Sequence, residues 1–203
     1  MATISLVRVG GVCAVLAVVS GTMARIAFGN EWLKSRGVDT LITGHWFDVL
    51  GVLLFMVAAL GFYRALRQTG PLPLIAVVAS LTGGIFLFFH EFIRLGISYE
   101  LVPNTLGQTG WLAAGVGSVL IVGVGILLFS FAILRTSVLP KWIGWLGLVN
   151  LAAHVALVTV LSGVFENIRP PWLLAMGTFQ GWVLAMGVVL LRLKEPVASD
   201  SAA

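Results

Sequence analysis

Six long apolar runs follow one another along the chain, separated by short polar or turn-rich segments. Each run approaches or exceeds the ~20 residues with which an α-helix crosses the hydrocarbon core of a bilayer. None shows the sustained alternation of polar and apolar residues that a transmembrane β-barrel requires. The pattern therefore predicts an all-α fold, a polytopic bundle of six transmembrane helices. The predicted spans are residues 4–25, 44–66, 72–97, 111–135, 141–163 and 171–192.

The first run has one feature of a secretory signal peptide, because Arg8 precedes an apolar stretch. The run is rich in Gly and Val, however, and ends at Arg25 without a clear A-x-A cleavage site. We interpret it as a retained first span. At the other end, Pro171 suits the first turn of the last helix. We expect one transmembrane domain over residues 1–195, followed by a short disordered tail, 196–203.

Composition supports a lipid environment. Hydrophobic residues make up 59% of the chain and charged residues only 10%, with a mean hydropathy of +1.06. Soluble domains carry roughly 25% charged residues, so this chain lacks the polar surface that water requires. The net charge of +4 is spread between the apolar runs rather than gathered in a patch, which argues against nucleic-acid binding. The lone cysteine, Cys13, has no partner for an internal disulfide and is interpreted as a packing residue.

Basic residues predict the orientation, because cytoplasmic loops carry an excess of Lys and Arg. One side of the predicted bundle collects seven of the twelve and the other side five. Six of the eight acids fall on the second side. We therefore predict that both chain termini are cytoplasmic. The first side has Arg8, Arg64, Arg67, Arg135, Lys141, Arg192 and Lys194, and the second has Arg25, Lys34, Arg36, Arg94 and Arg169.

Small residues spaced four apart predict close helix packing, because lipid provides no hydrophobic drive for helix association. Ala17 and Gly21 form such a stripe in the first span, and Gly177, Gly181 and Ala185 form another in the last. The second stripe has two interpretations. It packs within one chain, or it forms the seam of a homodimer.

Ionisable residues gather near the predicted outer ends of the first three spans. They are Arg25, His45, Asp48, His90, Glu91 and Arg94. Counting from residue 72 at ~1.5 Å per residue puts His90 about 27 Å along its span, in or near the outer interfacial zone. Charged side chains are tolerated there, because they can extend to the interface.

This outer layer has two interpretations. The first is a structural collar of ion pairs, with Glu91 on Arg94 and Asp48 on Arg25. The second is a polar pocket that opens outward and binds a headgroup, a quinone or another small amphiphile. Three further polar residues, Asn150, His154 and Gln180, fall deeper in the membrane. They are typical of packing residues that bond to a neighbouring helix.

The sequence gives less support to a metal site or a haem site. His90 and Glu91 resemble half of the H-E-x-x-H zinc motif, but Arg94 stands where the second histidine belongs and would repel a metal. His45, Asp48 and His90 would be the alternative ligand set. Two histidines could hold a haem axially, with His90 paired with His45 or His154. By helical rise His90 and His154 differ in depth by about 7 Å, which argues against sharing one iron. We predict no metal, no cofactor and no catalytic residue.

The segment from Leu127 to Leu157 resembles the most recognisable part of a bacterial family of integral membrane proteins known only as a domain of unknown function. The residues that carry the resemblance are Arg135, Ser137, Leu139, Pro140, Lys141, Trp142 and Gly144. The segment "ALGFYRALRQTGP" also resembles the Leu-Tyr-Arg exit of the family's second span. The resemblance implies a six-span fold in the bacterial inner membrane and implies no substrate.

The favoured function is a non-enzymatic one, either binding of a small amphiphile or lipid, or an accessory role in a membrane complex. A membrane redox protein with haem or quinone is the first alternative. A small channel or transporter, dimeric through the last span, is the second.

Overall fold

The structure is a computed structural model that describes residues 5–159 and 170–193. These residues are almost entirely helical, and no strand occurs among them. The α-helices are α1 (Leu6–Ala27), α2 (Glu31–Lys34), α3 (Thr40–Leu66), α4 (Leu72–Ser98), α5 (Gly107–Ser118), α6 (Leu127–Leu134), α7 (Lys141–Thr159) and α8 (Pro170–Arg192). Short 3-10 turns, η1 (Arg67–Thr69) and η2 (Asn104–Leu106), join them, and a π-helical segment, η3 (Val119–Ile126), connects α5 to α6.

Within the described residues, five helical segments are long and apolar enough to cross a membrane. They are Leu6–Ala27, Thr40–Thr69, Leu72–Ser98, Asn104–Leu134 and Leu174–Arg192. Their ends lie within four residues of five predicted spans, except that the fourth segment begins seven residues earlier than predicted. The remaining predicted span, 141–163, corresponds to α7, and its last four residues lie outside the described part of the chain. The predicted tail, 196–203, also lies outside it.

The second span begins earlier than predicted, at Thr40 instead of residue 44. The cause is a helix cap, because the Asp39 carboxylate accepts hydrogen bonds from the backbone N–H groups of Leu41 and Ile42 at 3.0 Å. Such a cap satisfies backbone donors that otherwise lack partners at a helix start. As a result His45 lies inside α3, more than a turn from its end.

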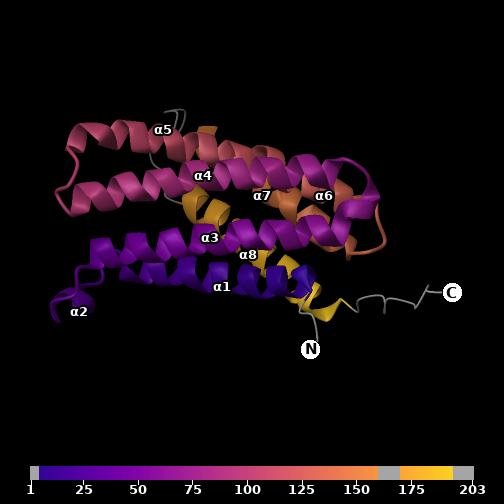
Figure 1. Cartoon of the computed structure of the whole chain (residues 1–203), viewed down its shortest axis with the longest axis horizontal. Helices are drawn as coiled ribbons and strands as arrows, with labels where there is room; N and C mark the ends of the chain where they lie inside the picture. The colour runs from indigo at the N-terminus through magenta and orange to yellow at the C-terminus, as the bar shows by residue number, and fades with distance from the viewer. Residues whose placement is uncertain (1–4, 160–169, 194–203) are drawn as a thin grey trace.

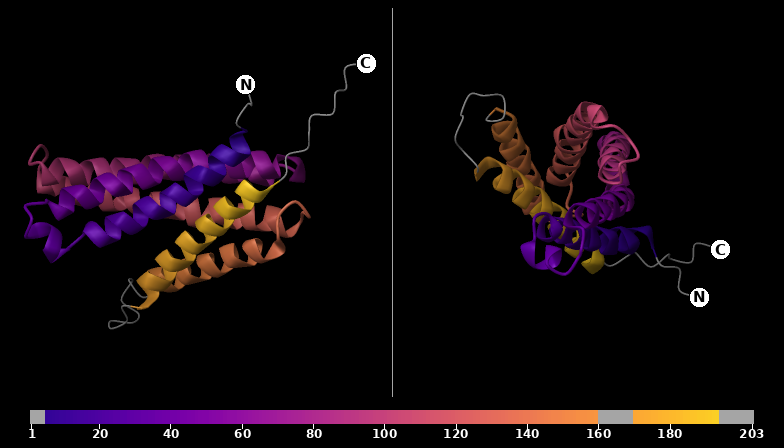
Figure 2. Two further views of the ribbon diagram at one scale, coloured as in Figure 1. Left: turned by 90° about the horizontal axis from the view of Figure 1, so that it is seen from below. Right: turned by 90° about the vertical axis from the view of Figure 1, so that its left-hand side faces the viewer.

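The helices run roughly alternately up and down along one long axis (Figure 1). In the same view, α1 begins and α8 finishes at one end of the bundle, which we call the inner end. The opposite end, where α1 ends and α3 begins, is called the outer end. The pair α7 and α8 diverges from the other helices toward the outer end (Figure 2). The bundle is therefore wedge-shaped, closed at the inner end and wider at the outer end.

Glycines bring the helices into backbone contact. A Cβ atom on Gly10 of α1 would lie 2.6 Å from the Cα of Gly61 on α3, and one on Gly11 would lie 3.0 Å from the carbonyl oxygen of Gly187 on α8. Lipid-exposed helices associate through such small-residue contacts. Because all four residues lie in the inner halves of their helices, they hold α1, α3 and α8 together there.

Only part of the predicted small-residue packing lies within the chain. Ala17 is buried, and a Cβ on Gly21 would lie 3.2 Å from the Gln180 amide nitrogen, so this stripe does pack against neighbours. A Cβ on Gly177 or Gly181 would meet no atom of the described residues within 4 Å. The interpretation that these two glycines pack within one chain gains no support from the described contacts.

Aromatic side chains fill the inner half between these helices. Trp182 is fully buried, packs edge-to-face on Phe62 with ring centroids 5.6 Å apart, and also contacts Phe129. Its indole N–H donates a hydrogen bond of 3.1 Å to the backbone carbonyl of Ile143. This cluster joins α3, α6, α7 and α8, and we call it the aromatic plug (Phe62, Phe129 and Trp182).

Candidate functional site

A cavity of about 210 Å³ lies among α1, α3, α4, α5, η3, α7 and α8. Five of its lining residues are ionisable or carry an amide, Ser118 adds a hydroxyl, and most of the rest are apolar. The ionisable and amide residues of the lining are Arg25, Asp48, Glu91, His154 and Gln180. The cavity is thus amphipathic, with its charged side chains contributed by the outer parts of α1, α3 and α4.

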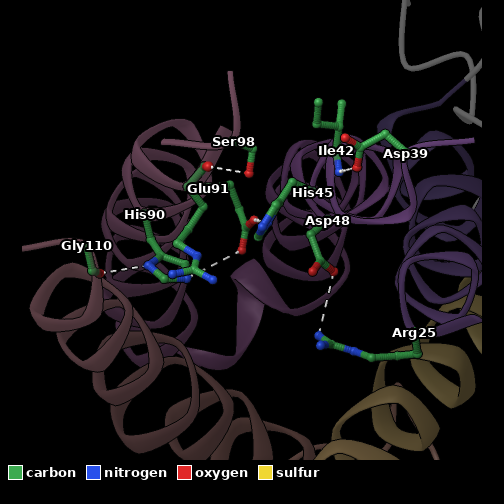
Figure 3. Close-up of polar contacts among 10 residues, drawn as sticks. Arg25, Asp39, Ile42, His45, Asp48, His90, Glu91, Ser98 and Gly110 are labelled. Carbon is green, nitrogen blue, oxygen red and sulfur yellow. Dashed lines mark hydrogen bonds and ion pairs between the residues drawn. The ribbon is translucent and has the colours of Figure 1, made fainter. Parts of the chain in front are cut away.

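Arg25 and Asp48 form the first pair on the cavity wall. The Arg25 guanidinium lies 3.6 Å from the Asp48 carboxylate, and the two side chains are 43% and 15% exposed. Figure 3 shows the two side chains extending toward each other from α1 and α3. The predicted Asp48–Arg25 ion pair is therefore present, with its acidic partner mostly buried.

Glu91 is held by a histidine from the neighbouring helix. Its carboxylate lies 2.7 Å from Nδ1 of His45, and both side chains are nearly buried (Figure 3). Nε2 of His45 is buried and has no hydrogen-bond partner among the described residues. The neutral imidazole with its proton on Nδ1 fits this geometry, because a proton on Nε2 would be a buried donor without an acceptor. His45 thus donates to Glu91 and orients it.

His90 lies behind Glu91 and faces away from the cavity. Its Nδ1 lies 2.8 Å from the carbonyl oxygen of Gly110, so this nitrogen carries a proton and donates it. Its Nε2 is 3.8 Å from the Glu91 carboxylate, beyond hydrogen-bond length. The contact ties α4 to α5, and His90 supports the wall rather than lining it.

Arg94 does not form the predicted ion pair. Within the described residues, the Glu91 carboxylate is bonded to His45, and Arg94 instead lies 5.9 Å from the centroid of the Trp111 ring. Cations are attracted to such ring faces at this range. Of the two ion pairs predicted for the collar, the described residues therefore form Arg25–Asp48 but not Glu91–Arg94.

Two of the deeper polar residues face the same cavity. Nδ1 of His154 donates to the carbonyl oxygen of Asn150, 3.0 Å away and one turn earlier on α7. In the neutral ring this leaves Nε2 as an acceptor. The Gln180 amide makes no hydrogen bond to the described residues, and the missing side chain of Gly21 leaves room for it.

Asn150 does what was predicted for a packing residue. It is fully buried, and its amide nitrogen donates to the Ala175 carbonyl oxygen at 3.1 Å and the Thr178 hydroxyl at 3.0 Å. The bonds connect α7 to α8. Asn150 therefore belongs to the helix interface and not to the cavity.

The predicted polar residues and the cavity lining overlap in part. Three of the six outer residues, Arg25, Asp48 and Glu91, line the cavity, while His45, His90 and Arg94 do not. His154 and Gln180 line it although they were predicted to be packing residues. Gly21 could have indicated the position of Gln180, because a glycine on one helix leaves space for a polar side chain on the neighbouring helix.

The histidines are poorly placed to share a haem. Of the three, only His154 lines the cavity, and Nδ1 of each of the other two is already bonded to a protein group. The remaining nitrogen of His45 is buried close to the Phe28 ring, whose centroid is 5.1 Å from that of the imidazole. Two axial nitrogens do not face one common space. No group of three His, Cys, Asp or Glu side chains within the described ranges is arranged to hold a metal ion.

The chain matches no family model, no curated protein and no solved structure in the comparisons. The resemblance of residues 127–157 to a family of unknown function therefore stays a prediction. In the structure this segment comprises α6, a connection containing Arg135 and Pro140, and most of α7, which begins at Lys141.

Proposed function

We propose that the protein is a six-span integral protein of the cell membrane, with the inner end of the bundle in the cytoplasm. The ends of the described helices support this orientation. Arg8, Arg64, Arg135, Lys141 and Arg192 lie at the inner end, where the described residues include no acid. Five acids, Glu31, Asp39, Asp48, Glu91 and Glu100, lie in the outer half of the bundle. The excess of basic residues is typical of the cytoplasmic side.

Cysteine labelling of intact cells tests this orientation. In a Cys13→Ala background, Ser35→Cys beside α2 should react with a membrane-impermeant maleimide. Gln68→Cys in η1 should react only after the cells are opened. Both residues are exposed, so the difference reports the membrane side rather than burial. The reverse pattern would show that the bundle is inverted.

We infer that the protein binds a small amphiphile in the cavity. The observation that carries this proposal is the cavity itself, which joins charged outer walls to a largely apolar lining from seven helical segments. Ligand sites are commonly concave, largely apolar and furnished with a few convergent polar groups. Ionisable residues inside a membrane are costly and are functional candidates.

The arrangement also favours binding over a purely structural role. Polar side chains with a purely structural role in an apolar bundle are expected to be hydrogen-bonded to other protein groups, because a buried polar group without a partner costs free energy. Here Gln180 and His154 line the cavity, and neither the Gln180 amide nor Nε2 of His154 makes a hydrogen bond to the described residues. A bound polar group would satisfy them.

Filling the cavity should abolish binding. Val52→Phe adds a ring to the cavity wall on α3, and purified protein carrying it is expected to lose the small molecules that wild-type protein retains. Mass spectrometry of the denatured protein identifies these molecules. Val78→Phe is the matched control, because Val78 on α4 is 55% exposed and outside the cavity lining. Equal retention by wild type and Val52→Phe would refute the site.

A further inference from the structure

Hydrogen-bond acceptors dominate the polar part of the cavity. Two carboxylates, Asp48 and Glu91, line it together with His154, whose Nδ1 is bonded within its own helix, and Ser118 adds a hydroxyl that can donate or accept. The Gln180 amide offers one acceptor and one donor group. The guanidinium of Arg25 is the only cationic side chain among the described lining residues, and it lies against Asp48. A ligand that brings hydrogen-bond donors therefore fits this lining better than one that brings acceptors.

The charges of the lining residues also favour a ligand that carries hydrogen-bond donors. Arg25 offsets the charge of Asp48, which leaves the charge of Glu91. The group that bonds Glu91 is His45, in the tautomer that donates from Nδ1 and carries no charge. Arg94, which is also at the outer end, lies by the Trp111 ring and not on Glu91. Among the described residues, the cavity wall thus has one carboxylate charge more than it has cationic partners.

The remaining lining sets the size and character of the ligand. Phe55 and Phe179 lie on facing helices with ring centroids 5.6 Å apart, and both line the cavity. The volume of about 210 Å³ is below the roughly 300–1,000 Å³ of pockets that hold drug-sized molecules. This space suits a single ring or a short alkyl chain. The faces of the phenylalanine rings also attract cations.

We propose that the ligand of this cavity is a small hydrophobic amine, whose ammonium group lies between Glu91 and Asp48 while its apolar body packs against Phe55 and Phe179. This inference rests on the proposed function and names its ligand class. The ammonium donates to Glu91, and His154 and Gln180 accept further N–H groups. His45 acts as a positioning residue, because it fixes the Glu91 carboxylate without lining the cavity.

Three probes of similar size and different charge test the inference. Phenethylamine is cationic, phenethyl alcohol is neutral, and phenylacetate is anionic. Their affinities for the full-length protein in detergent micelles are measured by titration calorimetry. We expect the amine to bind at least about tenfold more tightly than the alcohol, since a charge-assisted hydrogen bond contributes about that much. Phenylacetate should bind most weakly.

Two glutamate variants locate the effect. Glu91→Gln keeps the shape of the side chain and removes its charge, and it should remove the preference for the amine over the alcohol. Glu100→Gln makes the same change at the same end of the bundle, outside the cavity, and should alter neither. The wild-type comparison of the three probes decides the inference even if Glu91→Gln does not fold.

The outcomes separate the ligand class from the binding function. Equal affinities for amine and alcohol would overturn the amine inference and leave the amphiphile site standing. Tightest binding of phenylacetate would also overturn it and would make Arg25 the anchoring residue. If none of the three probes binds, the proposed ligand class is refuted. The binding function itself is refuted separately, if wild-type and Val52→Phe proteins retain the same small molecules.

Discussion

Replacing Trp182 with alanine is expected to lower the free energy of unfolding by about 3–5 kcal/mol, the usual cost of removing a buried aromatic side chain. Trp182 is fully buried and packs against Phe62 and Phe129. Its removal leaves a void in the aromatic plug that joins four helices. Because helices in lipid associate mainly through packing contacts, a void there is not offset by a hydrophobic drive. Equilibrium unfolding in mixed micelles measures the change.

A conservative variant separates packing from hydrogen bonding at this position. Trp182→Phe keeps much of the aromatic volume and loses the indole N–H that donates to the Ile143 carbonyl. It is expected to cost about 1–2 kcal/mol, from the lost bond and a small void. If the phenylalanine variant were as unstable as the alanine variant, the hydrogen bond rather than the plug would stabilise the inner half.

Gly117→Ala is expected to destabilise the protein by about 1–3 kcal/mol, in the range of overpacked cores. A Cβ atom on Gly117 would lie 2.8 Å from the carbonyl oxygen of Gly83 and 2.9 Å from Cγ of Leu87. A carbonyl oxygen belongs to the backbone and cannot rotate away, so α4 and α5 must separate. The same unfolding experiment measures the loss.

Gly115 provides a control on the same helix. A Cβ atom there meets nothing within 4 Å, so Gly115→Ala introduces no contact. Alanine also has a higher helix propensity than glycine, by about 1 kcal/mol in water. The Gly115 variant should therefore be as stable as wild type or slightly more stable. Equal losses at both positions would mean that helix flexibility, rather than the close approach of α4 and α5, accounts for the result.

The long apolar helices were largely predictable, because their signal is the length of an apolar run. The ends of the helices are set by single capping side chains that lie outside the apolar runs. Asp39 starts α3 by capping two backbone N–H groups, and hydropathy alone assigned it to the preceding loop. The π-helical turn of η3 was not predicted either, because Val119–Ile126 has the same apolar composition as the α-helices around it.

The site was predictable in its depth and less so in its contacts. Counting residues along each span correctly grouped Arg25, Asp48 and Glu91 near one level, since helical rise is constant. The rotation of each helix about its own axis is fixed by packing with its neighbours, and one sequence does not contain that information. This rotation pairs Glu91 with His45 on another helix, although Arg94 is only three residues away on the same one.

The depth estimate also separated residues that share the cavity. His154 and Gln180 were placed below the outer layer and were therefore interpreted as packing residues. The cavity, however, extends along α1 from Ala17 to Arg25. Eight residues of helix correspond to about 12 Å, which is enough to include both levels. A set of polar residues at different depths can thus belong to one site when the helices around it diverge.

The glycine contacts and the aromatic plug have a consequence for the movement of solutes. Gly10 meets Gly61, and Gly11 meets Gly187, in the inner half of the bundle, with Trp182 filling the space between the helices. Among the described residues, these backbone contacts and the buried indole close the inner side of the cavity. Conduction to the inner end would require backbone surfaces in direct contact to part.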